Sequence, residues 1–233
     1  MFIGHYAVGF AAKKLQAKPS LGTYFLAAQF LDLLWPTLLM LKVEKAAISP
    51  GGPVPLSFTH YPVSHSLLAV LGWAVLFGLL YFLVKKNRGA AIMVGCCVVS
   101  HWLLDLVVHL PDLPLYPGGN DFYGLGLWKV KTIELLVELL LFAAGVLFYY
   151  RATKAKNKTG VYALGALVIF LLVVHLVNAF GPPPTDITAV AWAGQLQWLI
   201  VLWGYWVDRN RVAKAGNAPI ETAQFTSGQV VAS

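Results

Sequence analysis

Long apolar runs, separated by short polar connections, dominate the chain. Each run has about 20 residues, the length an α-helix needs to cross a hydrocarbon core roughly 30 Å thick. The pattern therefore predicts an all-α fold, a polytopic membrane helix bundle in which residues 1–210 form a single domain. The six predicted transmembrane helices are Leu21–Leu41, Val63–Val84, Ala90–Leu110, Thr132–Tyr150, Gly160–Phe180 and Ile187–Val207.

The first residues, MFIGHYAVGFAA, form an apolar segment that is too short to cross a membrane. A helix of this length rises about 18 Å. One interpretation is a half-span that begins near mid-bilayer, lines the bundle and ends at Lys13 and Lys14. The alternative is an amphipathic helix that lies in the membrane interface. The basic residues follow the apolar stretch, which is not the order found in a secretory signal peptide.

Three other stretches lack the pattern of a spanning helix. Residues 42–62 and 111–131 are long connections rich in Pro, Gly and aromatic residues, and both fall on the same side of the predicted bundle. Loops of this kind are common places for binding, although they also serve as plain connectors. Residues 211–233 are small, polar and aperiodic, and we expect them to form a disordered cytoplasmic tail.

Composition supports a membrane protein. Hydrophobic residues make up 58% of the chain and charged residues 12%, against about a quarter charged in soluble domains. The mean hydropathy is +0.69. These values exclude an ordinary water-soluble enzyme and make the lipid bilayer the first expected partner. Two adjacent cysteines, Cys96 and Cys97, lie in an apolar run and cannot form a disulfide framework.

The net charge of +7 reflects membrane topology. By the positive-inside rule, the more basic side of the bundle faces the cytoplasm. We therefore expect a multi-pass protein of the prokaryotic plasma (inner) membrane, with both termini in the cytoplasm and no nucleic-acid partner. The more basic side carries Lys13, Lys14, Lys18, Lys85, Lys86, Arg88, Arg151, Lys154, Lys156, Lys158, Arg209, Arg211 and Lys214, and the other carries Lys42, Lys45, Lys129 and Lys131.

Ionisable side chains lie within or at the ends of the predicted spans. Such groups are costly in lipid, so each is a candidate functional residue. Because successive spans alternate in direction, nearly all of these groups fall in the outer half of the bundle and predict one outward-facing pocket. They are Asp32, His65, His101, Asp105, His109, Glu134, Glu138 and His175.

The third predicted span carries the most informative pattern, SHWLLDLVVHLPD. His101, Asp105 and His109 are four residues apart and share one helix face, and Asp112 follows close to the same angle. An imidazole and a carboxylate one turn apart can bind a single metal ion. Mixed His and Asp ligands favour a divalent ion, with Zn²⁺ as the first choice and Mn²⁺ or Fe²⁺ next.

Other segments contribute further candidate ligands. His60 and His65 come from the sequence HYPVSHS, and His5 and Asp32 lie in the first two apolar segments. Alternatively, His5 is a hydrogen-bonded core histidine and His60 an ordinary loop residue. In a straight helix His65 lies about 30 Å from the inner end, well above Asp32, so convergence requires tilted helices or a second helix that begins lower.

Four residues are candidates for supporting roles around a metal: Asp112, Glu134, Glu138 and His175. Each also has a structural interpretation. Asp112 and the neighbouring His109 lie where a solvated helix end is expected. Glu134 is one turn from Lys131, which can form an ion pair with it, and His175 can form an interhelical hydrogen bond.

Taken in order, GHYAVG, LDLL, HYPVSHS and SHWLLD resemble motifs of the small bacterial and archaeal membrane-bound metal-dependent hydrolases. That family shows a Thr-His start, a Pro-Asp-x-Asp element, a His-Arg-Gly-x-Thr-His-Ser element and a Ser-His-x-x-x-Asp helix. Gly4, Leu34 and Tyr61 depart from these motifs. The resemblance covers residues 1–112. It implies metal-site roles for His5, Asp32, His60, His65, His101 and Asp105.

These observations lead to the hypothesis of a membrane-embedded, zinc-like metal-dependent hydrolase. We expect His5, His65, His101 and Asp105 to hold the metal, and Asp32 to act as a ligand or general base. His60 and His109 would complete a second metal position or protonate the leaving group. The depth of the pocket favours an amphiphilic, lipid-like phospho- or acyl-ester, as in a phospholipase.

Two other functions fit the same residues. In a proton- or metal-coupled transporter, the intramembrane His, Asp and Glu residues would carry protons or metal across the membrane. Transport needs a polar path to both faces, and the inner halves of the predicted spans are almost entirely apolar. A non-catalytic membrane scaffold leaves the intramembrane carboxylates without a role.

Overall fold

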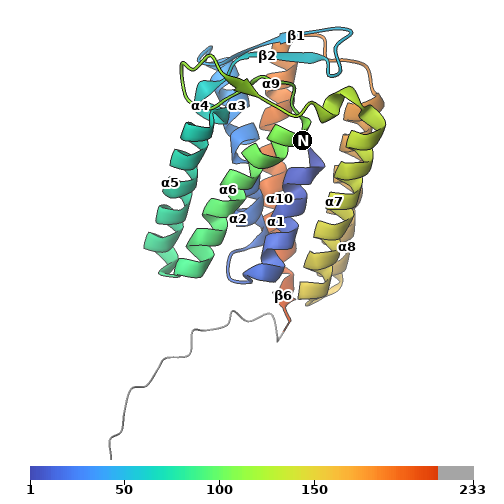
Figure 1. The fold of residues 1–233 in the computed structure, drawn as a ribbon. Helices are drawn as coiled ribbons and strands as arrows, with labels where there is room; N and C mark the ends of the chain where they lie inside the picture. The colour runs from blue at the N-terminus through green and yellow to red at the C-terminus, as the bar shows by residue number, and fades with distance from the viewer. Residues whose placement is uncertain (215–233) are drawn as a thin grey trace, which may run out of the picture.

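Long helices packed side by side make up the structure, a computed structural model that describes residues 1–214 (Figure 1). The predicted all-α, polytopic bundle is confirmed. The α-helices are α1 (Ile3–Leu15), α2 (Leu21–Ala28), α3 (Phe30–Met40), α4 (Pro62–His65), α5 (Leu67–Lys85), α6 (Arg88–Val108), α7 (Lys131–Ala152), α8 (Lys158–Phe180), α9 (Ile187–Gln195) and α10 (Gln197–Arg209). A short 3-10 helix, η1, occupies Leu127–Lys129.

The described part of the chain contains five segments long and apolar enough to cross a membrane as single helices. They are α5, α6, α7, α8 and the continuous stretch from α9 to α10. The first predicted span is instead broken, because α2 and α3 meet at an angle of 55°. Counting this bent pair as one span gives six, the number predicted from the apolar runs.

The break between α2 and α3 is stabilised by polar side chains inside the bundle. Gln29, at the junction, donates to Gln197 Oε1 at 2.6 Å and to Asp32 Oδ2 at 3.1 Å. The Ala28 carbonyl oxygen lies 2.7 Å from His101 Nδ1. Broken helices are tolerated within membranes when neighbouring groups satisfy the freed backbone in this way.

The second predicted span begins four residues later than expected. Ser66 accepts a hydrogen bond from the Ala69 backbone N–H and caps α5 at its first turn. The residues just before it form the separate short helix α4. His65 is therefore not part of the long helix, and the expectation that it lies well above Asp32 was wrong.

Two β-hairpins lie across one end of the bundle (Figure 1). They form from the two long connections: β1 (Lys45–Ile48) pairs antiparallel with β2 (Leu56–His60), and β3 (Leu113–Pro114) with β4 (Phe122–Tyr123). We call this the hairpin end. The opposite end carries most of the basic residues, and we call it the basic end.

A short strand pair at the basic end changes the boundary of the predicted tail. β6 (Arg211–Ala213) pairs with β5 (Thr153–Ala155). The buried Arg211 guanidinium donates to Thr153 Oγ1 at 2.9 Å and to the Gly160 carbonyl at 2.9 Å. The prediction of disorder from residue 211 was therefore wrong for these first residues. The remainder of the predicted tail, residues 215–233, lies outside the described residues.

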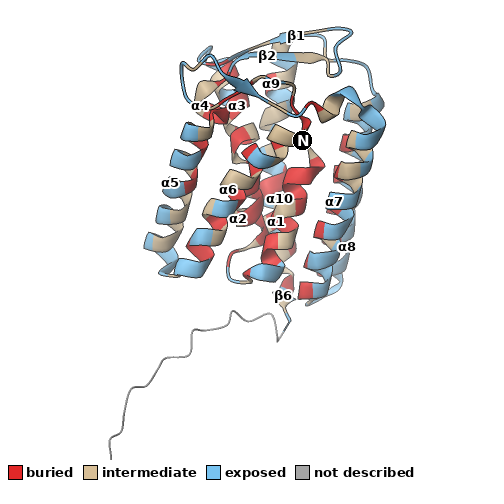
Figure 2. Ribbon diagram, viewed as in Figure 1, coloured by how far each residue is buried: buried red, intermediate tan, exposed pale blue. Residues whose placement is uncertain are grey.

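Helix α1 lies in the middle of the bundle, so it is a buried half-span and not an interfacial helix (Figure 2). Tyr6 and Phe10 are fully buried and pack edge to face against Phe25. At the helix end, Lys13 Nζ lies 2.7 Å from Asp208 Oδ2. Met1 is also buried, inside the bundle and away from the basic end. The expectation that both termini lie in the cytoplasm stays a prediction.

The outward faces of the long helices are apolar. Exposed large hydrophobic side chains occur along α5, α7, α8 and α10, including Val75, Leu140, Ile169 and Leu202. Figure 2 shows these exposed faces directed away from the buried centre. In water such a surface is unfavourable, whereas in a bilayer the lipid tails cover it. The hydrophobic excess in the composition is thus located on the outside of the bundle.

A glycine allows α1 and α7 to approach closely. A side chain on Gly145 of α7 would collide with the backbone of Ala7 in α1. Gly165 of α8, in contrast, has nothing within 4 Å of the place its side chain would occupy. Small residues at helix contacts let backbones pack closely in membranes.

We therefore expect Gly145→Leu to separate α1 from α7 and to lower the free energy of unfolding by about 2 kcal/mol. Gly165→Leu adds the same side chain at an open position and should leave stability close to that of the parent. Unfolding by increasing denaturant in detergent micelles measures both. Equal stability of the two variants would contradict the close packing of α1 against α7.

Candidate metal site

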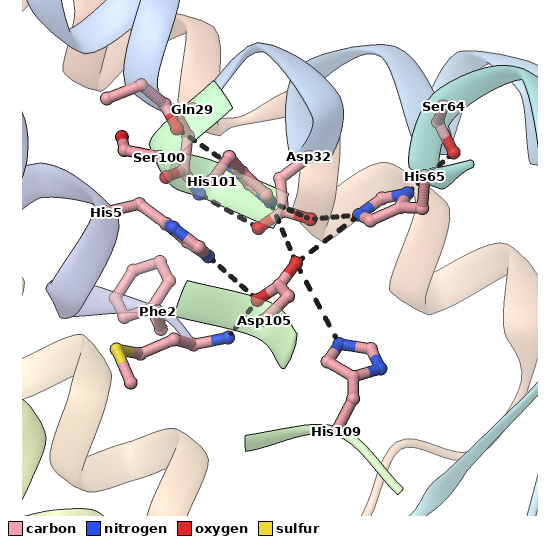
Figure 3. A network of polar contacts seen from close by, with 12 residues as sticks. Phe2, His5, Gln29, Asp32, Ser64, His65, Ser100, His101, Asp105 and His109 are labelled. Carbon is pink, nitrogen blue, oxygen red and sulfur yellow. Dashed lines mark hydrogen bonds and ion pairs between the residues drawn. The ribbon is translucent and has the colours of Figure 1, made fainter. Parts of the chain in front are cut away.

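The buried carboxylate of Asp105 is the centre of a cluster of imidazoles (Figure 3). Only 2% of the Asp105 side chain is exposed. Its Oδ1 lies 3.1 Å from His5 Nε2, and its Oδ2 lies 3.1 Å from His101 Nε2. His65 Nε2 and His109 Nε2 approach the same Oδ2 at 3.8 Å and 3.9 Å. Four histidines from α1, α4, α6 and the end of α6 therefore surround one carboxylate.

A second carboxylate faces the same imidazoles. Asp32 Oδ1 lies 3.6 Å from His65 Nε2 and 3.7 Å from His101 Nε2. Its side chain is 28% exposed, the largest value among these residues. Two groups have ligand atoms within 4.8 Å of one another: His5, His101 and Asp105, and Asp32, His65 and His101. The five predicted metal ligands thus come together at one place.

His101 is oriented by the broken helix. Its Nδ1 lies 2.7 Å from the Ala28 carbonyl oxygen, which can only accept a hydrogen bond. Nδ1 therefore carries a proton, and Nε2 is the nitrogen that faces the carboxylates. That Nε2 has no hydrogen-bond partner among the described residues. The ring also stacks on His5, with centroids 3.6 Å apart.

A buried relay orients His65. Its Nδ1 lies 2.7 Å from Ser64 Oγ, and the Ser64 hydroxyl donates to Glu44 Oε2 at 2.6 Å. Because the Ser64 proton is used in that bond, its oxygen accepts from His65 Nδ1–H. Glu44 also accepts from the backbone N–H groups of Val63 and Ser64, both at 2.8 Å. His65 Nε2 therefore faces the cluster.

His109 follows the same pattern at the edge of the site. Its Nδ1 lies 2.8 Å from Asp112 Oδ1, which also accepts from the Tyr61 hydroxyl at 2.9 Å. Burial lowers the pKa of His109, which favours the neutral ring with a free lone pair on Nε2. Phe58 and Trp128 pack beside the imidazole, with ring centroids 5.1 Å and 4.1 Å away.

These hydrogen bonds leave Nε2 of His65, His101 and His109 directed at the two carboxylates. In a neutral ring that nitrogen carries a lone pair, which can bind a metal ion. The Met1 amino group, 2.8 Å from Asp105 Oδ1, supplies one positive charge on the far side of that carboxylate. Buried carboxylates and imidazole nitrogens that converge on one position suit a divalent metal ion. The His and Asp groups could therefore hold a metal.

Comparison with models of known protein families assigns the chain to one of them. The model of a family described as the YdjM inner membrane protein matches residues 1–181. The chain belongs to the YdjM inner membrane protein family. Neither the curated proteins nor the solved structures contain a match to the chain. The family inferred from the four short motifs, the membrane-bound metal-dependent hydrolases, was therefore wrong.

Membership in the YdjM family also indicates which membrane contains the protein. Together with the long apolar helices, it supports a multi-pass protein of the inner membrane. The matched region runs from α1 through α8 and includes every residue of the cluster. The final span, α9 with α10, lies beyond the match.

The structure does not bring every predicted site residue to the cluster. His60 ends the strand β2, where it is exposed beside Lys45. Glu138 accepts from the backbone N–H groups of Phe2 and Gly4, at 3.0 Å and 3.1 Å, and so anchors the start of α1. It positions His5 from the α7 side and does not face Asp105.

The remaining predicted supporting residues lie around Glu138. Glu134 is one turn away on α7, and the buried His175 of α8 has an Nε2 without a hydrogen-bond partner among the described residues. The expected ion pair of Glu134 with Lys131 does not form. Lys131 instead donates to the Ala179 carbonyl and lies over the Phe180 ring.

Several supporting groups were missed from the sequence. Ser64 directly precedes His65 in the motif HYPVSHS, so its position gave a usable signal. Glu44 and the Ala28 carbonyl gave none, because their contacts depend on the path of the loop and on the break in the first span.

We expect the purified protein to bind a divalent ion such as Zn²⁺, and both His101→Ala and Asp32→Asn to weaken that binding by more than about tenfold. Asp32→Asn keeps the size of a partly exposed side chain, so it tests the site even if His101→Ala fails to fold. His60→Ala removes an exposed histidine outside the cluster and serves as the control. Metal content and titration calorimetry give the readout; unchanged affinity in Asp32→Asn and in folded His101→Ala would contradict the site.

Ser64→Ala should weaken metal affinity about tenfold, because His65 loses the acceptor that fixes its proton on Nδ1. Ser100→Ala is a matched control: Ser100 directly precedes His101, but its hydroxyl donates only to the Cys97 carbonyl of the same helix. The same titrations compare the two. Equal affinities would show that the relay from Glu44 does not orient the ligand.

Proposed function

We propose that the protein is a membrane-embedded metal-dependent hydrolase. The observation that carries the proposal is the convergence of His65, His101, Asp105 and Asp32 around one buried position, with both rings oriented by hydrogen bonds from Nδ1 so that Nε2 faces the carboxylates. Zn²⁺ suits this mixture of ligands best, with Mn²⁺ or Fe²⁺ as the alternatives.

A divalent ion in this position supplies Lewis acidity and makes water a stronger nucleophile. The residues of the chain divide the remaining tasks. Asp32 is the most exposed of the set, so it is placed to accept a proton from an incoming water molecule. His109 lies at the hairpin side of Asp105 and is held by Asp112, which places it to exchange a proton with a leaving group.

We propose a lipid-like phospho- or acyl-ester as the substrate. The cluster lies near the hairpin end of a bundle whose outer surface is apolar, so an amphiphilic molecule can reach it from the membrane. Phe58 and Trp128 beside His109 offer apolar contacts to such a molecule. By the positive-inside rule, the basic residues at the opposite end support an orientation with the hairpin end on the outer side of the membrane.

The interior between the cluster and the basic end favours hydrolysis over transport. Phe10, Phe25, Phe142 and Tyr149 are buried there and pack against one another around α1. A transporter needs a polar path that reaches both faces of the membrane. In this aromatic core the only hydrogen-bonding side-chain group of the four residues is the Tyr149 hydroxyl, and it already donates to Asp208 at 2.9 Å.

A panel of phospholipids and acyl-esters in mixed micelles, incubated with metal-loaded protein, tests the proposal. We expect turnover of at least one ester, and a loss of at least about a hundredfold in Asp105→Asn and Asp32→Asn. His60→Ala should retain the parent rate. Metal-loaded parent protein that moves metal or protons into vesicles, but hydrolyses none of the esters, would contradict the proposal in favour of transport.

A further inference from the structure

A cavity at the basic end lies far along the bundle from the His/Asp cluster. It has a volume of about 460 Å³ and forms where the start of α2 meets the ends of α5 and α10. We call it the basic cavity. Its lining residues are Lys18, Ser20, Thr23, Tyr81, Lys85, Tyr205, Asp208 and Arg209.

The positive charges of the basic cavity are not neutralised by the protein. Lys18, Lys85 and Arg209 form no ion pair with any carboxylate among residues 1–214. The single carboxylate in the lining, Asp208, is already engaged: it accepts from Lys13 Nζ at 2.7 Å and from the Tyr149 hydroxyl at 2.9 Å. The cavity therefore carries an uncompensated positive charge, which favours an anion.

Hydroxyl groups line the same cavity. Ser20 Oγ lies 2.9 Å from Thr23 Oγ1, which lies 3.2 Å from the Tyr205 hydroxyl. Two of the three hydroxyl protons are used within this chain, which leaves one O–H to donate to an oxyanion. The first turn of α2 begins at Ser20, so the positive end of a helix dipole also points toward the cavity. Cations, hydroxyls and a helix start together match the chemistry of a phosphate group.

The surroundings of the cavity point to a lipid as the source of the phosphate. Leu83 and Val84, next to Lys85, are exposed on the lipid-facing side of α5, and Trp206 is exposed on α10. Apolar side chains therefore continue from the rim of the cavity along the membrane-facing surface. Tyr81 and Tyr205 lie at the helix ends, where aromatic residues favour the headgroup region.

We propose that the basic cavity binds the phosphate of an anionic phospholipid from the leaflet at the basic end. Lys18, Lys85 and Arg209 neutralise the phosphate, and the exposed side chains of α5 contact its acyl chains. This binding is separate from the proposed hydrolysis, because the cavity and the His/Asp cluster lie at opposite ends of the bundle.

Native mass spectrometry of the detergent-purified full chain, with phosphatidylglycerol or phosphatidylcholine added, tests this site. We expect the parent protein to bind phosphatidylglycerol more tightly than phosphatidylcholine. The triple variant K18Q/K85Q/R209Q should bind phosphatidylglycerol at least about tenfold more weakly. The triple variant R151Q/K154Q/K158Q removes the same charge from exposed positions at the same end and should stay within about twofold of the parent.

Two results would overturn the proposal. An equal loss in both triple variants would mean that the whole basic rim attracts anionic lipid without a defined site. The second result is that millimolar inorganic phosphate displaces phosphatidylglycerol and binds with the same affinity as the lipid. The cavity would then be a site for a free anion. Neither result depends on hydrolysis, so this test is independent of the metal site.

Discussion

The buried carboxylate of Asp105 is the constraint on which the inner structure depends. A charge in this position is costly, so groups from several helices are arranged to compensate it. Helix α1 enters the centre of the bundle and delivers His5, anchored at its start by Glu138. The first span breaks at Ala28, whose carbonyl oxygen accepts a hydrogen bond from His101 Nδ1. The central placement of α1 and the break of the first span thus each supply a partner to this site.

The two ends of the bundle carry different chemistry, and aromatic side chains pack between them. Carboxylates and imidazoles gather toward the hairpin end, while lysines and arginines line the basic end. Between them, the buried rings of Phe10, Phe25 and Tyr149 fill the interior around α1. An apolar outer surface faces the lipid along the whole length. This division is consistent with a site that takes its substrate from one side of the membrane.

Much of this arrangement could be predicted from periodicity. The apolar runs gave the spans, and the four-residue spacing of His101, Asp105 and His109 gave one face of a helix. Breaks in helices could not be predicted, because hydropathy does not distinguish a continuous span from a bent pair such as α2 and α3. His60 was misplaced because its loop folds into an exposed strand. Short shared motifs also suggested the wrong family, whereas a match across residues 1–181 assigned the chain to the YdjM inner membrane protein family.

The most direct test of the metal site is anomalous X-ray diffraction from crystals of the protein soaked with Zn²⁺. The hydrogen bonds that fix His65 and His101 predict a strong peak about 2.0–2.2 Å from both Nε2 atoms and from a carboxylate oxygen of Asp32 or Asp105. A peak only at exposed His60, or no peak among these residues in a crystal that holds zinc elsewhere, would contradict a metal centre at this position.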